Sequence, residues 1–134
     1  AVALNYETFY SSLRQNVDEA TFQRIQNIHE RALGNGLNVS FGTASLQLRL
    51  SFMKNTFIGF KTNGTLYLPM LHRDSKCPPE KAEFLKEHFY DPLVELTGIE
   101  IGEKTTYKEN VSQWLECPQE VLDLIEEVYF GDFS

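Results

Sequence analysis

The sequence predicts an α+β fold in which helices cover one face of an antiparallel sheet. Helical spacing of apolar residues occurs before residue 34 and again after residue 77, whereas the residues between alternate apolar and polar, as in half-buried strands. Asn63-Gly64 lies inside that alternating region and is a strong β-hairpin signal. A length of 134 residues with 42% hydrophobic content suits a single α+β domain spanning 1–134.

The chain opens with a predicted helix or helix pair. Aromatic and leucine side chains recur at helical spacing from residue 5 to 15, and Asp18 is placed to cap a second run. Gly34-Asn35-Gly36 predicts the end of that run. Its apolar face comprises Phe22, Ile25, Ile28, Ala32 and Leu33.

Four strands in a meander follow. Their predicted ranges are 37–41, 46–52, 56–62 and 65–71. Within the second range, Gln47, Arg49 and Ser51 alternate with apolar residues and should face away from the helices. Pro69 cannot donate to a ladder, so it should lie on an edge strand or at a strand end.

Helical spacing returns after Cys77. One apolar stripe comprises Phe84, Leu85, His88, Phe89, Leu93 and Leu96. An acidic stripe comprises Glu80, Glu83, Glu87, Asp91 and Glu95. Pro92 predicts a kink or interruption at Asp91, with Asp91 as the candidate N-cap of a new helix and Pro92 at its first position. Gly98 predicts the end of this long helix.

The C-terminal part predicts one further strand and one further helix. Residues 99–107 suit a short fifth strand, and a C-terminal helix should run from Pro118 to about Phe130. The inward face of that helix should comprise Val121, Leu122, Ile125, Val128 and Tyr129. The long helix and this C-terminal helix should pack with the first helices on one face of the sheet.

Charge is segregated along the chain. Residues 31–73 contain five Lys or Arg and no Asp or Glu, whereas residues 109–134 contain seven Asp or Glu and no Lys or Arg. The first 108 residues contain twelve acids and twelve bases, whose charges cancel. The formal net charge of −7 therefore resides in the last 26 residues. The molecule should therefore be electrically two-faced.

The acidic C-terminal helix is the candidate partner-binding site. Its predicted residues are Glu120, Asp123, Glu126, Glu127, Phe130 and Phe133. An unbalanced acidic surface speeds encounter with a basic partner, either another protein or the basic sheet of a second copy in a homodimer. The alternative interpretation is an ordinary amphipathic helix with a solvated face.

No motif in the chain names a reaction. P-loop, nucleophile-elbow and zinc-ligand spacings are absent, and the four predicted strands offer no carboxylate for a metal-dependent nuclease. We therefore expect a non-catalytic regulator, adaptor or chaperone-like protein with neither metal nor cofactor. One alternative is an enzyme with a site near His72, Cys77 and Glu100. Another is nucleic-acid binding on the outward sheet face, which the net charge of −7 disfavours.

Two cysteines begin similar Cys-Pro-x-Glu segments at Cys77 and Cys117. The pattern predicts a helix start, with Pro at the first helical position and Cys where Ser or Thr normally caps. Because a thiol at a helix N-terminus has a lowered pKa, a redox role for the pair is the alternative. Two cysteines are too few for a disulfide scaffold, and the chain has neither a signal peptide nor a membrane span, so a cytoplasmic location is expected.

Overall fold

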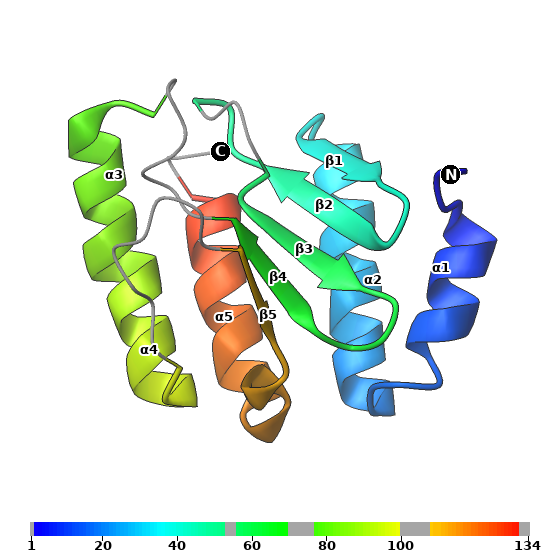
Figure 1. The fold of residues 1–134 in the computed structure, drawn as a ribbon. Helices are drawn as coiled ribbons and strands as arrows, with labels where there is room; N and C mark the ends of the chain where they lie inside the picture. The colour runs from blue at the N-terminus through cyan, green and yellow to red at the C-terminus, as the bar shows by residue number, and fades with distance from the viewer. Residues whose placement is uncertain (1, 53–55, 70–76, 100–107, 132–134) are drawn as a thin grey trace.

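The structure is a computed structural model that describes residues 2–52, 56–69, 77–99 and 108–131. The predicted α+β class is confirmed, with a helix pair at the N-terminus (Figure 1). The elements in chain order are α1 (Tyr6–Leu13), α2 (Glu19–Gly34), β1 (Asn38–Phe41), β2 (Ser45–Arg49), β3 (Ile58–Lys61), β4 (Leu66–Pro69), α3 (Pro79–Leu85), the π-helical η2 (Lys86–Tyr90), α4 (Asp91–Thr97), β5 (Lys108–Val111), the 3₁₀ turn η3 (Gln113–Glu116) and α5 (Pro118–Tyr129).

The sheet is an antiparallel meander of five strands in the order β1-β2-β3-β4-β5. The fifth strand of the described sheet is Lys108–Val111, whereas the range predicted for a fifth strand, 99–107, lies outside the described part beyond Ile99. Since β5 pairs with β4, β4 is not an edge strand, and Pro69 lies at its end opposite Lys108. Of the two positions predicted for Pro69, the strand end is correct.

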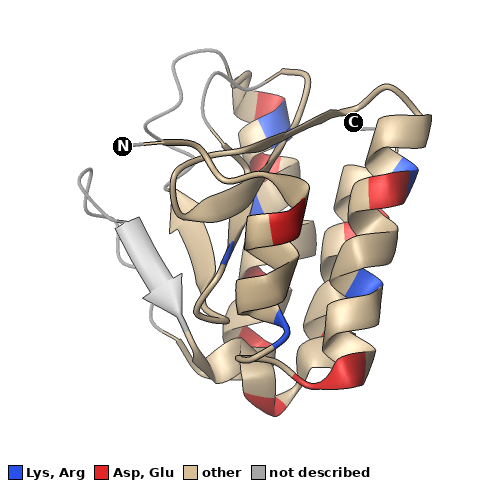
Figure 2. Cartoon of the chain, turned by 90° about the vertical axis from the view of Figure 1, so that its right-hand side faces the viewer, with Lys and Arg blue, Asp and Glu red and all other residues tan. Residues whose placement is uncertain are grey.

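The helices all lie on one side of the sheet, as the view along its edge shows (Figure 2). Cross-strand register places Phe41 opposite Leu46 and Leu46 opposite Phe60, so apolar side chains line the helix-facing side. The residues predicted to face inward from α5 are all buried, at 0–4% exposure. One hydrophobic core joins the two layers.

Two predicted apolar faces are wider than the real ones. Leu33 is 59% exposed and Leu96 is 41% exposed. Ala32 already occupies the buried position in the last turn of α2, so its neighbour Leu33 points outward. His88 is exposed as well, and its ring stacks on Phe84 with 4.2 Å between centroids.

The interruption predicted at Pro92 takes the form of a π-helical turn. The backbone N–H of Asp91 donates to the carbonyl of Lys86, five residues earlier, and Tyr90 keeps helical torsions. Proline lacks an N–H and its ring crowds the carbonyl four residues before it, which a widened turn relieves. Asp91 is therefore a helical residue and not a new N-cap. The residues buried around this turn are Phe89, Tyr90 and Leu93.

No helix among the described residues is long and apolar enough to span a lipid bilayer.

Candidate functional site

Helix α5 lies in the middle of the helix layer, between α2 and α4 (Figure 1). Its inner face is buried in the core, so the orientation of its outer face is fixed. Glu120, Asp123 and Glu127 are exposed and lie three and four residues apart, which places them along one side of the helix. These three residues are called the acidic stripe below.

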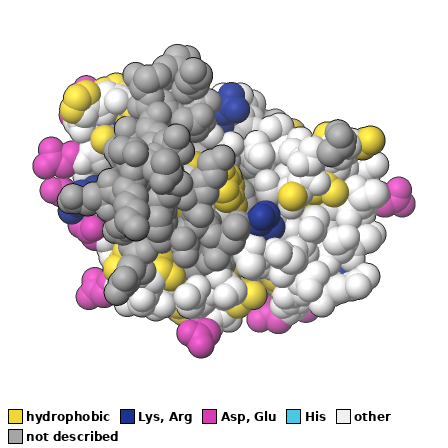
Figure 3. All heavy atoms as spheres, in the orientation of Figure 1, with side chains coloured by type: hydrophobic (Ala, Val, Ile, Leu, Met, Phe, Trp, Pro, Cys, Tyr) yellow, Lys and Arg dark blue, Asp and Glu magenta, His cyan; other side chains and the backbone are white. Residues whose placement is uncertain are grey.

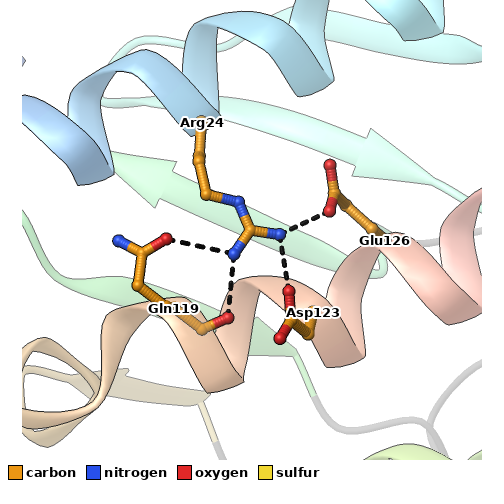
Figure 4. A network of polar contacts seen from close by, with 4 residues as sticks. All are labelled: Arg24, Gln119, Asp123 and Glu126. Atoms are coloured by element: carbon orange, nitrogen blue, oxygen red, sulfur yellow. Dashed lines mark hydrogen bonds and ion pairs between the residues drawn. The ribbon is translucent and has the colours of Figure 1, made fainter.

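Arg24 of α2 fastens α5 through four contacts (Figure 4). Its Nη1 donates to the backbone oxygen of Gln119 at 3.0 Å and to Oε1 of the same residue at 3.1 Å. Its Nη2 pairs with Asp123 Oδ1 at 2.8 Å and also with Glu126. Burial lowers the pKa of Arg24, but its hydrogen bonds to Glu126 and Asp123 outweigh that effect and raise the pKa overall.

The contacts of Arg24 divide the acids of α5 into two groups. Glu126 is 30% exposed and faces Arg24, whereas Asp123 is 71% exposed and keeps access to solvent while paired. Glu120 and Glu127 take part in no ion pair within the described part of the chain. Within α5, Glu120 and Glu127 therefore lack a cationic partner among the described residues, as expected for an unbalanced acidic segment. Asp123 and Glu126 share the single cation Arg24, which lies far earlier in the sequence.

The C-terminal part of the acidic stripe is electrostatically unfavourable for α5 itself, whereas Glu120 lies in the first turn, where the helix dipole favours an acid. Asp123 and Glu127 are like charges at i and i+4, a spacing that destabilises a helix by about 0.2–0.5 kcal/mol. Glu126 and Glu127 also lie near the negative end of the helix dipole, and the last turn contains no basic residue. Part of this electrostatic destabilisation is offset by the ion pairs of Asp123 and Glu126 with Arg24.

Phe130 contributes to the α2–α5 contact. The Arg31 guanidinium lies 4.1 Å from its ring centroid, and the Tyr129 ring is 5.1 Å away. Tyr129 in turn donates from its hydroxyl to the carbonyl of Asn38 at 2.6 Å, and burial raises its pKa to about 12. Half-buried Phe130 therefore already has a cationic neighbour, while Phe133 lies outside the described residues.

The helix beside α5 adds further exposed acids. On α3, η2 and α4 these are Glu80, Glu83, Glu87, Asp91 and Glu95. Lys86 pairs with Asp91 at 3.1 Å, and both side chains are more than half exposed. The outer surface of α3, α4 and α5 is accordingly dominated by carboxylates.

The opposite side of the molecule is the open sheet face. Gly59 lies opposite both Gln47 and Tyr67, so β3 and β4 turn Gly59, Lys61 and Tyr67 outward, which the sequence alone left undecided. Strands β1 to β4 contain no Asp or Glu. Figure 3 shows Lys or Arg on this face and Asp or Glu towards its outline. The two-faced charge distribution thus follows the two layers.

Only one of the two cysteines lies at the start of a helix in the predicted way. Cys117 is the N-cap of α5 as expected, whereas Pro78 is the N-cap of α3 and Cys77 precedes it. Burial raises the pKa of Cys117, and Glu120 and Glu116 raise it further, opposite to the predicted lowering. The two thiols are not joined in a disulfide.

Two residues of the alternative enzyme site, His72 and Glu100, lie outside the described residues, so only the position of Cys77 is known. Among the residues that the structure describes, no cluster of three or more His, Cys, Asp or Glu suits a metal ion.

Two polar groups are buried in the helix layer. His29 is 4% exposed, and its Nδ1 shares a hydrogen bond of 2.8 Å with the Tyr10 hydroxyl. The Tyr90 hydroxyl is buried and has no hydrogen-bond partner among the described residues, and burial, then Cys77, raises its pKa. The spacing of apolar residues along a helix indicates which positions are buried, but it does not predict the hydrogen-bond partners of polar atoms at those positions.

The fold and the site together define an α+β protein with an acidic helix layer and an acid-free meander of β1 to β4. Comparison of the chain with protein-family models, with curated proteins and with solved structures gives no match. Its function must therefore be inferred from charge and geometry.

Proposed function

We propose that this protein is a non-catalytic interaction module that binds a basic segment of a protein partner along the acidic stripe of α5. A regulator, an adaptor or a chaperone-like protein would work in this way. The observation that carries the proposal is that Glu120 and Glu127 are exposed on α5 and take part in no ion pair with the described residues, and that Glu127 lies near the negative end of the helix dipole, where it does not stabilise the helix. Local electrostatic rules are most often broken at functional sites, where a partner supplies the compensation.

Rigidity of α5 supports this proposal. Its inner side chains are buried and Arg24 fixes its outer edge, so the acidic stripe is presented in one arrangement. Binding to a preorganised surface avoids the entropy cost of ordering it.

The chemistry of the surface suits a partner rich in Lys or Arg. The carboxylates of α3 and α4 extend the negative potential beside α5, which would steer a cationic segment towards the acidic stripe. Such an association weakens as salt is added, because exposed charges are screened. The proposal assigns the protein to the cytoplasm, in keeping with only two cysteines.

The test is a quantitative pull-down with the intact chain and the double variant Glu120→Gln and Glu127→Gln. Both side chains are exposed, so this variant keeps the core and removes two charges. We expect proteins held by the wild type to be lost. A matched control, Glu7→Gln with Glu30→Gln, removes two exposed charges on α1 and α2, away from the acidic stripe and from α3 and α4, and should retain them. Retention of every partner by the α5 variant would refute the proposal.

A further inference from the structure

Strand β1 forms one edge of the sheet, and β5 forms the other. Strand β1 pairs regularly with β2, from Asn38 opposite Arg49 to Phe41 opposite Leu46. Asn38 and Ser40 are exposed, whereas Val39 and Phe41 are half-buried against the helix layer.

The outward hydrogen-bonding groups of β1 belong to Val39 and Phe41. The N–H of Gly42 donates to the carbonyl of Ser45 at 2.8 Å, which fixes the alternation of the antiparallel ladder. Ser40 and Asn38 therefore bond to β2, and the N–H and C=O groups of Val39 and Phe41 point away from the sheet. They form no hydrogen bond within the described part of the chain.

Apart from its short length, this edge lacks the features that normally prevent strand pairing. Proteins protect edges with charged residues, proline or bulges. The sequence Asn38-Val39-Ser40-Phe41 has no charge and no proline, and its register with β2 has no bulge. By contrast, β5 contains Lys108 and Glu109.

Charge also distinguishes the two edges. Residues 1–73 contain seven Lys or Arg and four Asp or Glu, whereas residues 74–134 contain five and fifteen. Two copies that met at β5 would bring their acidic halves together. Two copies that met at β1 would keep those halves apart, with α3 and α4 at the far ends (Figure 1).

We infer that β1 pairs with β1 of a second copy, in an antiparallel dimer whose two-fold axis passes beside Ser40. In this register, Val39 of each copy lies opposite Phe41 of the other, and each pair exchanges two N–H to O=C bonds. Ser40 then faces its own counterpart, which is small and uncharged. Leu4 donates to the Gly42 carbonyl at 2.8 Å and closes the edge at that end, so pairing is confined to the short strand and the dimer is weak.

The primary test is sedimentation equilibrium on the intact chain from about 10 µM to about 1 mM, a range suited to a weak association. We expect the average mass to rise from 15.4 kDa towards twice that value. Over the same range, hydrogen exchange at the Val39 and Phe41 amides should slow. A constant mass of 15.4 kDa, or exchange at these two amides that does not change with concentration, would overturn the inference.

A matched pair of variants identifies the interface. Ser40→Lys places a lysine beside its own copy at the axis and should raise the dimer dissociation constant about tenfold or more. Ser112→Lys makes the same change at an exposed position after β5 and should associate like the wild type. Equal association of both variants would place the contact elsewhere. The Glu120→Gln and Glu127→Gln variant should dimerise normally, which separates this inference from the proposed function.

Discussion

At the scale of single residues, the described chain depends on a few polar side chains that connect elements distant in sequence. Arg24 joins α2 to α5, and Trp114 joins η3 to the β3–β4 turn. The Tyr10–His29 hydrogen bond joins α1 to α2 inside an aromatic cluster that also contains Phe41. Each contact satisfies a group that burial would otherwise penalise.

Replacement of Arg24 by alanine should lower the free energy of unfolding by about 1–2 kcal/mol, because charged hydrogen bonds in a partly buried site are lost. Two carboxylates would then lie close together without a cation. Urea unfolding measures the change. Lys86→Ala removes a far more exposed ion pair and should cost about 0.5 kcal/mol or less. Equal losses in the two variants would contradict the role assigned to Arg24.

The buried His29 should make folding sensitive to acid. Burial lowers its folded-state pKa, although Glu30 opposes this, so protonation favours the unfolded chain. Its stabilising contribution is complete above the unfolded pKa of about 6.5 and decreases as the pH falls below it. Between about pH 7.5 and about pH 5.5, the wild type should lose more unfolding free energy than His29→Gln. Parallel losses in denaturant titrations would argue against this.

At the scale of elements, the 3₁₀ turn η3 is held in place by its tryptophan. The indole N–H of Trp114 donates to the Gly64 carbonyl at 2.9 Å, and the side chain is 1% exposed. Gly64 adopts a positive φ of 89° and closes a three-residue hairpin loop, in which its N–H donates to the Lys61 carbonyl at 3.0 Å. The hairpin and the segment leading into α5 are thereby fastened together.

Trp114→Phe should lower the unfolding free energy by about 1–3 kcal/mol, since it leaves a smaller ring and an unpaired carbonyl. Circular dichroism is the suitable probe, because the chain has one tryptophan and the variant loses its fluorescence. An unchanged midpoint of unfolding would show that this connection is dispensable.

Helix α5 should become more stable when Glu127 of the acidic stripe is neutralised. In Glu127→Gln, repulsion from Asp123 and an unfavourable dipole contact disappear, for a gain of about 0.2–1 kcal/mol. Glu7→Gln is the contrasting control, because Glu7 lies in the favourable first turn of α1 and its loss should slightly destabilise. A destabilised Glu127→Gln variant in thermal or urea unfolding would mean that this acid supports the fold.

At the scale of the whole molecule, the helix layer and the sheet share one hydrophobic core, so the helices and the sheet should fold together. Helix α5 contributes five buried residues to that core. A chain that ends before Cys117 should therefore fail to fold, and its amide proton spectrum should lose dispersion. A dispersed spectrum would show that the remaining layers suffice. Point substitutions on the outer face therefore test partner binding better than truncation.

Much of the fold could be predicted because local patterns encode it. The 3.6-residue and two-residue periods identified the helices, the first four strands and every inward residue of α5. The strand at Lys108–Val111 was not predicted, because its position depends on pairing with β4 rather than on its own pattern. The π-helical turn was missed because the sequence shows where a proline interrupts a helix but not how neighbours absorb it.

The candidate site was predicted only in part. Glu120 and Glu127 are exposed as expected, but Asp123 and Glu126 face Arg24, and Phe130 contacts Arg31. Nothing local to residues 117–134 marks these two arginines as neighbours. The partner role of these residues stays a prediction.

The sequence by itself determined the fold class, the inward face of α5 and the separation of charge along the chain, because these follow from periodicity and composition. Only the tertiary structure decided which acids remain without a cation, which hairpin face is outward and which strand is left at the edge. These properties depend on pairing and packing between distant segments, which local patterns do not record.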